Sequence, residues 1–195
     1  MSCLVLGSAS PRRAELLAQL GVEFEIAAAD IDETPRPGEA ALDYVERMAR
    51  EKAMTLSRSL PGGALLTADT TVVLDGEALG KPRDADDARR MLQALSGKSH
   101  TVCTALHALS AAQCEQCQVQ TTVTMIELAP RLIEAYLATD EPWDKAGAYT
   151  IQGVAGSFVR RVDGSVSNVI GLPLAETREL LARIGIEALV AGVGP

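Results

Sequence analysis

The sequence predicts a single α/β domain built on a mixed sheet, and three observations indicate this. Strand-like apolar runs alternate with helical patterns, and some pairs of strand-like runs are joined by short turns. Alternation with helices favours parallel pairing and short turns give antiparallel pairing, so the sheet should contain both. The chain of 195 residues is 47% hydrophobic and has no repeat, low-complexity segment or Ser/Gly linker. One continuous fold over residues 1–195 can therefore bury a sufficient core.

The first elements are a strand over residues 3–7 and a helix over residues 11–20. An uninterrupted apolar run predicts the strand. Ser10 then suits the N-cap and Pro11 the first helical position, where the missing amide donor of proline costs nothing. Leucines recur at helical spacing until Gly21, which favours the end of the helix.

The remaining elements follow from the same patterns of apolar spacing and turn residues. Turns are predicted at Asp75-Gly76, around Cys114, and at Asp163-Gly164 inside a hairpin. An acidic, proline-rich loop over residues 30–38 and a loop over residues 140–153 lie between regular elements. Strands are predicted over residues 22–28, 64–74, 101–109 and 119–128, and helices over residues 39–58, 84–95, 130–139 and 174–184.

The formal net charge of −8 argues against a nucleic-acid partner, which requires a basic surface. No apolar run approaches the roughly 20 residues that span a bilayer. The beginning of the sequence also lacks the basic and apolar regions of a signal peptide. We therefore expect a cytoplasmic protein without a membrane partner, in which a local cluster of basic side chains captures any anionic substrate.

The four cysteines do not suggest a disulfide framework in a chain of this size, so we expect reduced thiols. Cys114 and Cys117 have the spacing of zinc ligands, although a structural zinc site needs four ligands. A lone C-x-x-C between two strand-like runs is more typical of a turn, and the zinc site remains the alternative. The residues available to such a site are Cys3, Cys103, Cys114, Cys117, His100 and His107.

The start of the first helix has the residue types that bind an anion. The free amides of its first turn and the positive end of the helix dipole attract negative charge. The hydroxyls of Ser8 and Ser10 and the guanidinium groups of Arg12 and Arg13 would converge on the same small volume. This arrangement predicts a phosphate site. The alternative is an ordinary capped helix whose arginines face solvent.

Two charged residues stand where the pattern predicts burial. Lys52 lies on the apolar stripe of the 39–58 helix, together with Val45 and Leu56. Its ammonium either extends to solvent from a buried stem or lines a cleft. Asp69 interrupts the apolar strand over residues 64–74, where a carboxylate is costly to bury unless it is paired, binds a metal or faces a cleft.

Two further charged residues are less specific, because Lys81 and Glu33 are predicted in loops. Together with Lys52, Asp69 and the arginines, however, they fit phosphoryl chemistry. Such reactions need neutralised phosphate oxygens, a divalent cation on oxygen ligands, and a carboxylate that positions or deprotonates water. The Walker pattern and the Gly-x-Ser-x-Gly pattern are absent from the sequence.

A series of short motifs resembles the Maf family of nucleoside triphosphate pyrophosphatases, in order and spacing, from about residue 3 to residue 186. The resemblance implies a fold like that of the inosine triphosphatases, with an elongated mixed sheet flanked by helices and a cleft between two lobes. The motifs are Ser8-Ala9-Ser10-Pro11-Arg12-Arg13, Asp32-Glu33-Thr34-Pro35, Arg50-Glu51-Lys52-Ala53, Ala68-Asp69-Thr70, Gly80-Lys81-Pro82, Leu95-Ser96-Gly97, Asp144-Lys145-Ala146-Gly147-Ala148-Tyr149, Ile151-Gln152-Gly153 and Gly171-Leu172-Pro173-Leu174.

The resemblance also implies an activity and roles for residues. The family cleaves a nucleoside triphosphate between its α and β phosphates, with Mg²⁺ or Mn²⁺, and releases a monophosphate and pyrophosphate. Asp69 resembles the general base of the family, and Glu33 and Asp69 match its metal-binding positions, where Glu33 holds the metal or water. Residues at positions that contact phosphates in the family are Ser8, Arg13, Lys52 and Lys81.

Within the family, the chain is similar to the dTTP/UTP pyrophosphatase subgroup. Arg12, Thr70 and Gln152 stand at its specificity positions, where the sister subgroup that acts on 7-methyl-GTP carries Trp, Gln and Glu. A neutral amide such as Gln152 both donates and accepts, which suits the edge of a pyrimidine. The sequence departs from the family only at Gly7, where Ala is usual, and the resemblance does not cover the tail after Glu187.

The expected function is thus hydrolysis of dTTP and UTP, and of modified pyrimidine triphosphates, which would clean the nucleotide pool. Two alternatives stay open: a 7-methyl-GTP pyrophosphatase of the same family, and a nucleotide-binding regulator of cell division. A homodimer would be usual for such folds.

Overall fold

The structure, a computed structural model, describes residues 4–60 and 62–189 and contains a seven-stranded mixed sheet. The strands follow the order β2-β1-β3-β5-β6-β7, and β4 pairs with β3 beside this path. β1 pairs in parallel with β2 and β3, whereas β3, β5, β6 and β7 pair antiparallel. The strands are β1 (Leu4–Gly7), β2 (Phe24–Ile26), β3 (Ala64–Leu74), β4 (Glu77–Leu79), β5 (Ser99–Leu109), β6 (Cys114–Met125) and β7 (Val159–Asp163).

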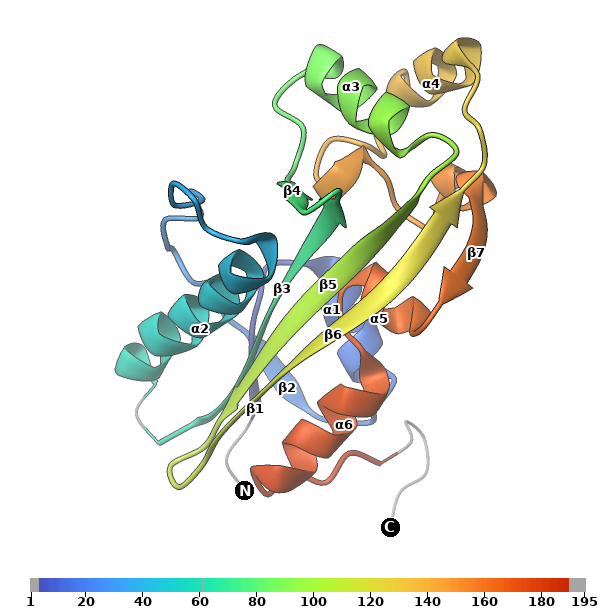
Figure 1. Ribbon diagram of the computed structural model, residues 1–195. Coiled ribbons are helices and arrows are strands. Elements are labelled where there is room, and N and C mark those ends of the chain that lie inside the picture. The colour runs from blue at the N-terminus through green and yellow to red at the C-terminus, as the bar shows by residue number, and fades with distance from the viewer. Residues whose placement is uncertain (1–3, 61, 190–195) are drawn as a thin grey trace.

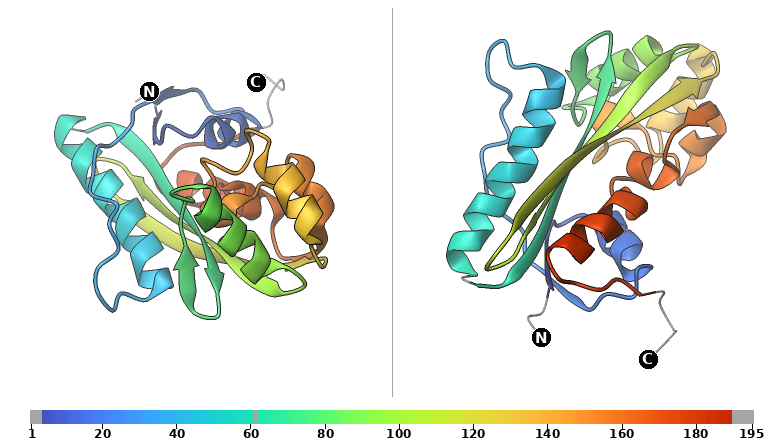
Figure 2. Two further views of the ribbon diagram at one scale, coloured as in Figure 1. Left: turned by 90° about the horizontal axis from the view of Figure 1, so that it is seen from above. Right: turned by 60° about the horizontal axis from the view of Figure 1, so that its bottom comes forward.

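Helices cover both faces of this sheet and one of its ends. α2 packs on one face of β3 and β5, and α5 and α6 pack on the other face (Figures 1 and 2). α3 and α4 lie together at the end of the long strands (Figure 1). The helices are α1 (Pro11–Ala18), α2 (Ala41–Ser59), α3 (Ala85–Leu95), α4 (Pro130–Leu137), α5 (Val166–Ile170) and α6 (Leu174–Arg183), with short 3₁₀ turns η1 (Ala146–Ala148) and η2 (Val154–Phe158). The predicted mixed α/β fold, with an elongated sheet flanked by helices, is confirmed.

The buried apolar side chains form two main clusters, and β3 passes from one to the other. Its first half contributes Leu66 and Ala68 to a cluster with β1, α1 and α6. Its second half contributes Val72 and Leu74 to a cluster with α3 and α4. Between these two parts lie three polar residues, of which Asp69 and Thr70 are only half-buried. The carboxylate therefore interrupts the strand where the two cores separate.

The predicted turn around Cys114 is wrong. The chain reverses at residues 110–113, where the Ser110 amide donates to the Gln113 carbonyl (2.8 Å). Cys114 and Cys117 belong to β6, paired with Leu109 and Leu106 of β5. Residues three apart in a strand point to opposite faces, so these two thiols do not converge on one ion. Cys103, Cys114 and Cys117 are free thiols, and Cys3 lies outside the described residues.

The predicted hairpin at Asp163-Gly164 is also wrong. β7 leads through Gly164, at φ 127°, into α5 rather than into a returning strand. The Ser165 side chain accepts a hydrogen bond from the Asn168 amide and so caps α5. Valine and serine alternate in this segment, which is a pattern typical of a strand, but the Ser165 cap stabilises a short helix instead.

Other boundaries agree closely with the sequence. The predicted strand over residues 64–74 is β3, and the predicted helix over residues 84–95 is α3 with Asp84 as its N-cap, whose side chain accepts from the Asp87 amide. Within the described residues, no helix has both the length and the apolar character needed to cross a membrane.

Candidate active site

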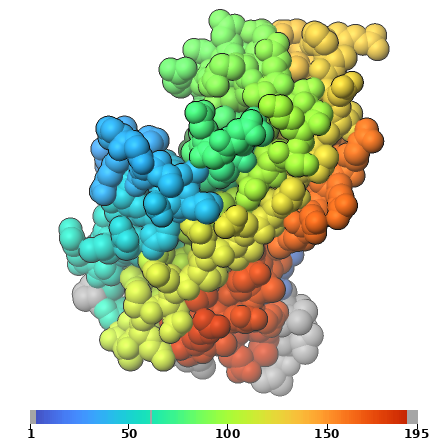
Figure 3. Space-filling model, viewed as in Figure 1, coloured from blue at the N-terminus to red at the C-terminus, as the bar shows by residue number. Residues whose placement is uncertain are grey.

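A cavity of about 500 Å³ opens beside the middle of β3. The surface is visibly hollowed between the segment around residues 30–45 and the β4–α3 segment (Figure 3). Its walls come from the β1–α1 turn, the loop before α2, α2, β3, and the segments near residues 80, 144–151 and 169–171. The predicted site residues that line it are Ser8, Ser10, Arg12, Arg13, Glu33, Lys52, Asp69, Thr70 and Lys81.

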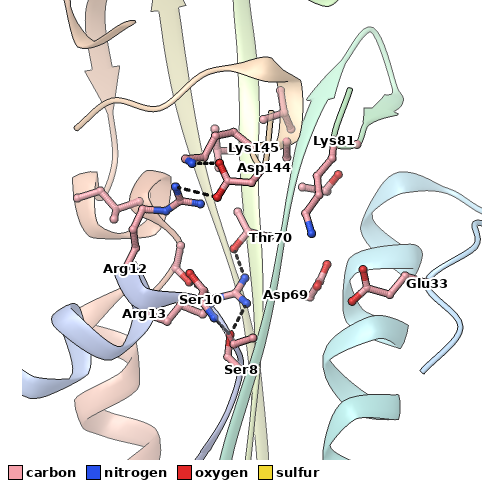
Figure 4. A pocket seen from close by; sticks show the side chains of 18 of the residues that line it. Ser8, Ser10, Arg12, Arg13, Glu33, Asp69, Thr70, Lys81, Asp144 and Lys145 are labelled. Atoms are coloured by element: carbon pink, nitrogen blue, oxygen red, sulfur yellow. Dashed lines mark hydrogen bonds and ion pairs between the residues drawn. The ribbon is translucent and has the colours of Figure 1, made fainter. Parts of the chain in front are cut away.

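The β1–α1 turn forms one wall of this cavity (Figure 4). Ser10 occupies the N-cap position of α1, as predicted, but its side chain makes no capping hydrogen bond. Instead, the buried Ser8 hydroxyl accepts from the Ser10 amide (3.2 Å). The Ser10 hydroxyl is therefore not committed to the helix and faces the cavity.

Arg13 is fixed in place by three elements rather than exposed to solvent. Its Nε donates to the Gly171 carbonyl (2.9 Å), and its two terminal nitrogens donate to the hydroxyls of Ser8 (3.1 Å) and Thr70 (2.9 Å). Burial lowers the pKa of the guanidinium from its ordinary value, and the charge of Asp69 opposes that shift. An arginine remains protonated despite such shifts, so Arg13 is a fixed positive charge in the cavity.

Lys52 ends between two carboxylates. Its Nζ lies 2.6 Å from Asp69 Oδ1 and 2.7 Å from Glu33 Oε1, and its side chain is 11% exposed. The ammonium therefore does not extend to open solvent, and the alternative in which Lys52 lines a cleft is the correct one. Burial would raise the pKa of Glu33, but the hydrogen bond and charge of Lys52, with smaller effects of Lys81 and Arg13, lower it overall.

One carboxylate oxygen of Glu33 and one of Asp69 thus contact the same ammonium, so both carboxylates face one region of the cavity. Mg²⁺ is commonly held by one or two carboxylates together with water and substrate phosphates. The donor set fits such an ion. Among residues 4–60 and 62–189, no group of three or more His, Cys, Asp or Glu side chains could hold a metal, so water and substrate phosphates would supply the other ligands of such an ion.

Lys81 approaches the same carboxylates from the segment that follows β4 (Figure 4). Its side chain extends toward Asp69 and Glu33, on the opposite side of the cavity from the β1–α1 turn. Together with Arg13 and Lys52, it forms the local basic cluster that an anionic substrate requires in a chain of net charge −8.

The three predicted specificity residues are not all brought together. Arg12 lies in the cavity wall 4.0 Å from a carboxylate oxygen of Asp144. The Thr70 hydroxyl is hydrogen-bonded to Arg13 and to the Thr104 hydroxyl (2.9 Å). Gln152 is exposed and does not line the cavity, although its neighbour Ile151 does.

Sequence reasoning assigned no role to Tyr44, Asp144 or Lys145, which also line the cavity. Asp144 and Lys145 contact each other and precede η1, where Gly147 adopts φ 69°. The Asp-Lys-Ala-Gly motif was visible in the sequence and could have pointed to them. Tyr44 gave no such signal, because it stands alone on an amphipathic helix.

Comparisons with known proteins agree with one another across nearly the whole chain. The family model described as Maf-like protein matches residues 3–184. The dTTP/UTP pyrophosphatase of Anaeromyxobacter dehalogenans strain 2CP-1 is 59% identical over 186 residues, covering 93% of this chain and 94% of that protein. Those of Myxococcus xanthus strain DK1622 and Shewanella oneidensis strain MR-1 are 55% and 51% identical, each covering 94% of this chain and 93% and 98% of their own lengths.

Solved structures resemble this chain more distantly. A HAM1 protein from Coxiella burnetii is 18% identical, with a TM-score of 0.44, covering 64% of this chain and 73% of that chain. The nucleoside-triphosphatase / dITP/XTP pyrophosphatase from Mycobacterium abscessus is 12% identical, with a TM-score of 0.42 and 93% coverage of both chains.

Proposed function

This chain belongs to the Maf-like protein family, and from its similarity to relatives of that name we infer that it is a dTTP/UTP pyrophosphatase. It hydrolyses each triphosphate to the nucleoside monophosphate and pyrophosphate. Curated relatives that carry this name are 51–59% identical over more than nine-tenths of the chain. The observation of the structure that best supports the activity is the contact of Lys52 with both Asp69 and Glu33, in the same cavity as Arg13.

The roles of the site residues follow from this arrangement as part of the proposal. Arg13, Lys52 and Lys81 bind the phosphate oxygens, because each places a positive charge in the cavity. The Ser8 and Ser10 hydroxyls and the first-turn amides of α1 add neutral donors to the same wall. Cations that hold the departing pyrophosphate stabilise the charge that develops as its bond to the α phosphorus breaks.

Asp69 serves as the general base. Its carboxylate accepts one proton from a water molecule as the water oxygen bonds to phosphorus, and the bridging oxygen leaves with the pyrophosphate. A divalent cation, Mg²⁺ or Mn²⁺, held by Glu33 and Asp69 would supply further neutralisation of the phosphate oxygens. Glu33 also helps to hold the water in line with the bond that breaks.

The base of the nucleotide is read near Arg12 and Thr70, which line the cavity beside the phosphate-binding residues. Gln152 is exposed next to Ile151 of the cavity wall, so its proposed contact with the pyrimidine would be made at the edge of the cavity. Replacing Arg12, Thr70 and Gln152 together by Trp, Gln and Glu should lower activity on dTTP and UTP relative to 7-methyl-GTP. An unchanged ranking of substrates in the folded, active variant would show that these positions do not read the base.

The same proposal extends to the setting of the enzyme: the chain acts as one domain in the cytoplasm, where these triphosphates are used, and assembles as a homodimer. Sedimentation of the purified protein at micromolar concentration tests the assembly.

The function is tested by measuring pyrophosphate release from dTTP, UTP, CTP, ATP, GTP and 7-methyl-GTP, each with Mg²⁺, with Mn²⁺ and with a chelator. We expect the highest kcat/KM with dTTP and UTP, and loss of activity with the chelator. Highest kcat/KM with 7-methyl-GTP would place the chain in the sister subgroup. Tight binding of dTTP without turnover under any condition would favour a nucleotide-binding regulator instead.

A further inference from the structure

The loop that carries Glu33 has no regular structure of its own. Residues 27–36, between β2 and α2, form neither helix nor strand. The Glu33 side chain is 49% exposed, and it pairs with the Lys52 ammonium. A carboxylate that must stay beside Asp69 therefore depends on how firmly the backbone of this loop is held.

Two side chains of α2 hold this backbone at consecutive peptide groups. The Tyr44 hydroxyl donates to the Glu33 carbonyl (2.9 Å), and the Arg47 guanidinium donates to the Thr34 carbonyl (3.1 Å). Tyr44 stands three residues before Arg47 and eight residues before Lys52 on α2, so it shares a helix face with each of them. The same helix thus supplies the two side chains that hold the loop and the ammonium that binds the Glu33 carboxylate.

Arg47 is itself held rigidly. It is 5% exposed, and it donates to both carboxylate oxygens of Glu39, from Nε at 2.6 Å and from a terminal nitrogen at 2.7 Å. Its other terminal nitrogen lies 3.5 Å from Glu51, and the guanidinium lies 5.6 Å from the centre of the Tyr44 ring. Because the planar guanidinium is already held by Glu39, it loses little further conformational freedom when it also binds the loop.

The protonation states suit these roles. The hydrogen bond from Arg47 lowers the pKa of Glu39 to about 2, so this carboxylate is charged at neutral pH. Burial and the nearby charges of Asp69 and Glu33 raise the pKa of Tyr44 to about 12, so its hydroxyl keeps the proton that it donates to the loop.

We propose that Tyr44 and Arg47 are positioning residues that hold the Glu33–Thr34 backbone against α2 and thereby keep the Glu33 carboxylate in the cavity beside Asp69. This inference rests on the proposed role of Glu33 in the reaction. A purely structural ion pair between Arg47 and Glu39 is the competing explanation, and it predicts effects on stability that do not depend on Glu33.

Substitutions of graded severity separate the two explanations. Tyr44→Phe removes one hydrogen bond, and we expect kcat/KM for dTTP to fall about threefold to tenfold. Arg47→Lys keeps the charge but removes the planar guanidinium and its contact with Thr34. We expect kcat/KM for dTTP to fall about tenfold to a hundredfold. Arg50→Met is the matched control, because Arg50 lies on the same helix, is 49% exposed and pairs with Glu46 rather than with the loop.

The decisive measurement is a double-mutant cycle in which each substitution is also made in the Glu33→Gln background. If Tyr44 and Arg47 act through Glu33, substituting them in the Glu33→Gln background should cause little further loss of kcat/KM. Hydrogen exchange should also become faster in the loop before α2 in Tyr44→Phe and Arg47→Lys, and should stay unchanged in Arg50→Met.

The outcomes distinguish failure of this inference from failure of the proposed function. A wild-type chain inactive on every triphosphate would contradict the function. Full activity of Glu33→Gln would remove the premise and overturn the inference. If the wild type is active and Glu33→Gln is impaired, two further results would overturn the inference. One is that Tyr44→Phe or Arg47→Lys lowers kcat/KM in the Glu33→Gln background as much as in the wild type. The other is unchanged hydrogen exchange in the loop before α2. If Arg47→Lys does not fold, Tyr44→Phe still decides the result.

Discussion

At the scale of single residues, the proposed chemistry of the cavity depends on one carboxylate at the point where β3 leaves one buried core and enters the other. Asp69 lies there within contact of the Lys52 ammonium and near a second carboxylate, Glu33. Two carboxylates and a positive charge are thereby close together. Such proximity suits the proposed attack of water on the phosphoanhydride of a triphosphate.

Asp69→Asn should therefore keep the fold and lose most of the turnover. The amide preserves the volume of the side chain but does not accept a proton from water, and loss of a general base typically lowers rates by about 10²- to 10⁴-fold. Pyrophosphate release from dTTP and the melting temperature are measured together. Asp75→Asn is the matched control, because Asp75 lies just after the same strand with a side chain that is 79% exposed. Near wild-type turnover in Asp69→Asn would refute the assignment of the base.

A second residue makes stability depend on pH. His100 is buried with its Nε2 2.7 Å from the Tyr149 hydroxyl, and burial lowers its pKa to about 4. Between about pH 6.5 and pH 4 the unfolded chain binds a proton at this residue and the folded chain does not, so acidification favours unfolding. Stability from this residue is present above the unfolded pKa and is lost as the pH falls.

From pH 7 to pH 5, the wild type should therefore lose on the order of 2 kcal/mol more free energy of unfolding than His100→Gln. Urea denaturation at the two pH values measures this difference. Equal losses in the two proteins would show that His100 does not carry the effect.

At the scale of elements, the sequence predicted boundaries best where a single local feature, such as an apolar run or a helix cap, sets them. The boundaries of β3 follow from a continuous apolar run, and the start of α3 follows from the Asp84 cap. β6 begins earlier than predicted because its first residues pair with β5 through backbone hydrogen bonds, which do not depend on side-chain pattern. α5 was missed because it is a short helix of only five residues and depends on a single cap at Ser165.

The departure at Gly7 has a physical reason in the packing of β1. A Cβ at this position would lie 2.5 Å from Thr67 Cγ2 and 2.7 Å from Leu56 Cδ1. Gly7→Ala should lower the free energy of unfolding by about 1–3 kcal/mol, as overpacking of a core typically does. It should also lower activity, because Ser8 follows directly. Thermal and chemical denaturation measure the loss.

A compensating change provides the control for this prediction. Thr67→Ser removes the methyl group that a Cβ at position 7 would meet, and serine retains the hydroxyl that donates to the Ala49 carbonyl (2.8 Å). The double variant should regain part of the lost stability. If Gly7→Ala alone is as stable as the wild type, the strand relaxes around the added methyl group.

At the scale of the whole molecule, the cavity is made by segments that the chain brings together from both of its cores. Spacing in the sequence identified the charged residues that line the cavity, because charge on an apolar stripe or strand is conspicuous. It did not predict that Lys52 would contact two carboxylates at once, since that depends on the distance between α2 and β3. It also did not predict that Gln152 would be exposed, because the loop after η1 has no regular pattern and is held by individual hydrogen bonds to Thr150 and Glu141.

The central claim is that this cavity cleaves dTTP and UTP between the α and β phosphates. The most direct test is to identify the products of dTTP hydrolysis by the wild type with Mg²⁺ or Mn²⁺, using phosphorus NMR, with Asp69→Asn in parallel. We expect dTMP and pyrophosphate in equal amounts from the wild type, the corresponding products from UTP, and almost no product from Asp69→Asn. Formation of dTDP and inorganic phosphate, or equal turnover by the two proteins, would contradict the claim.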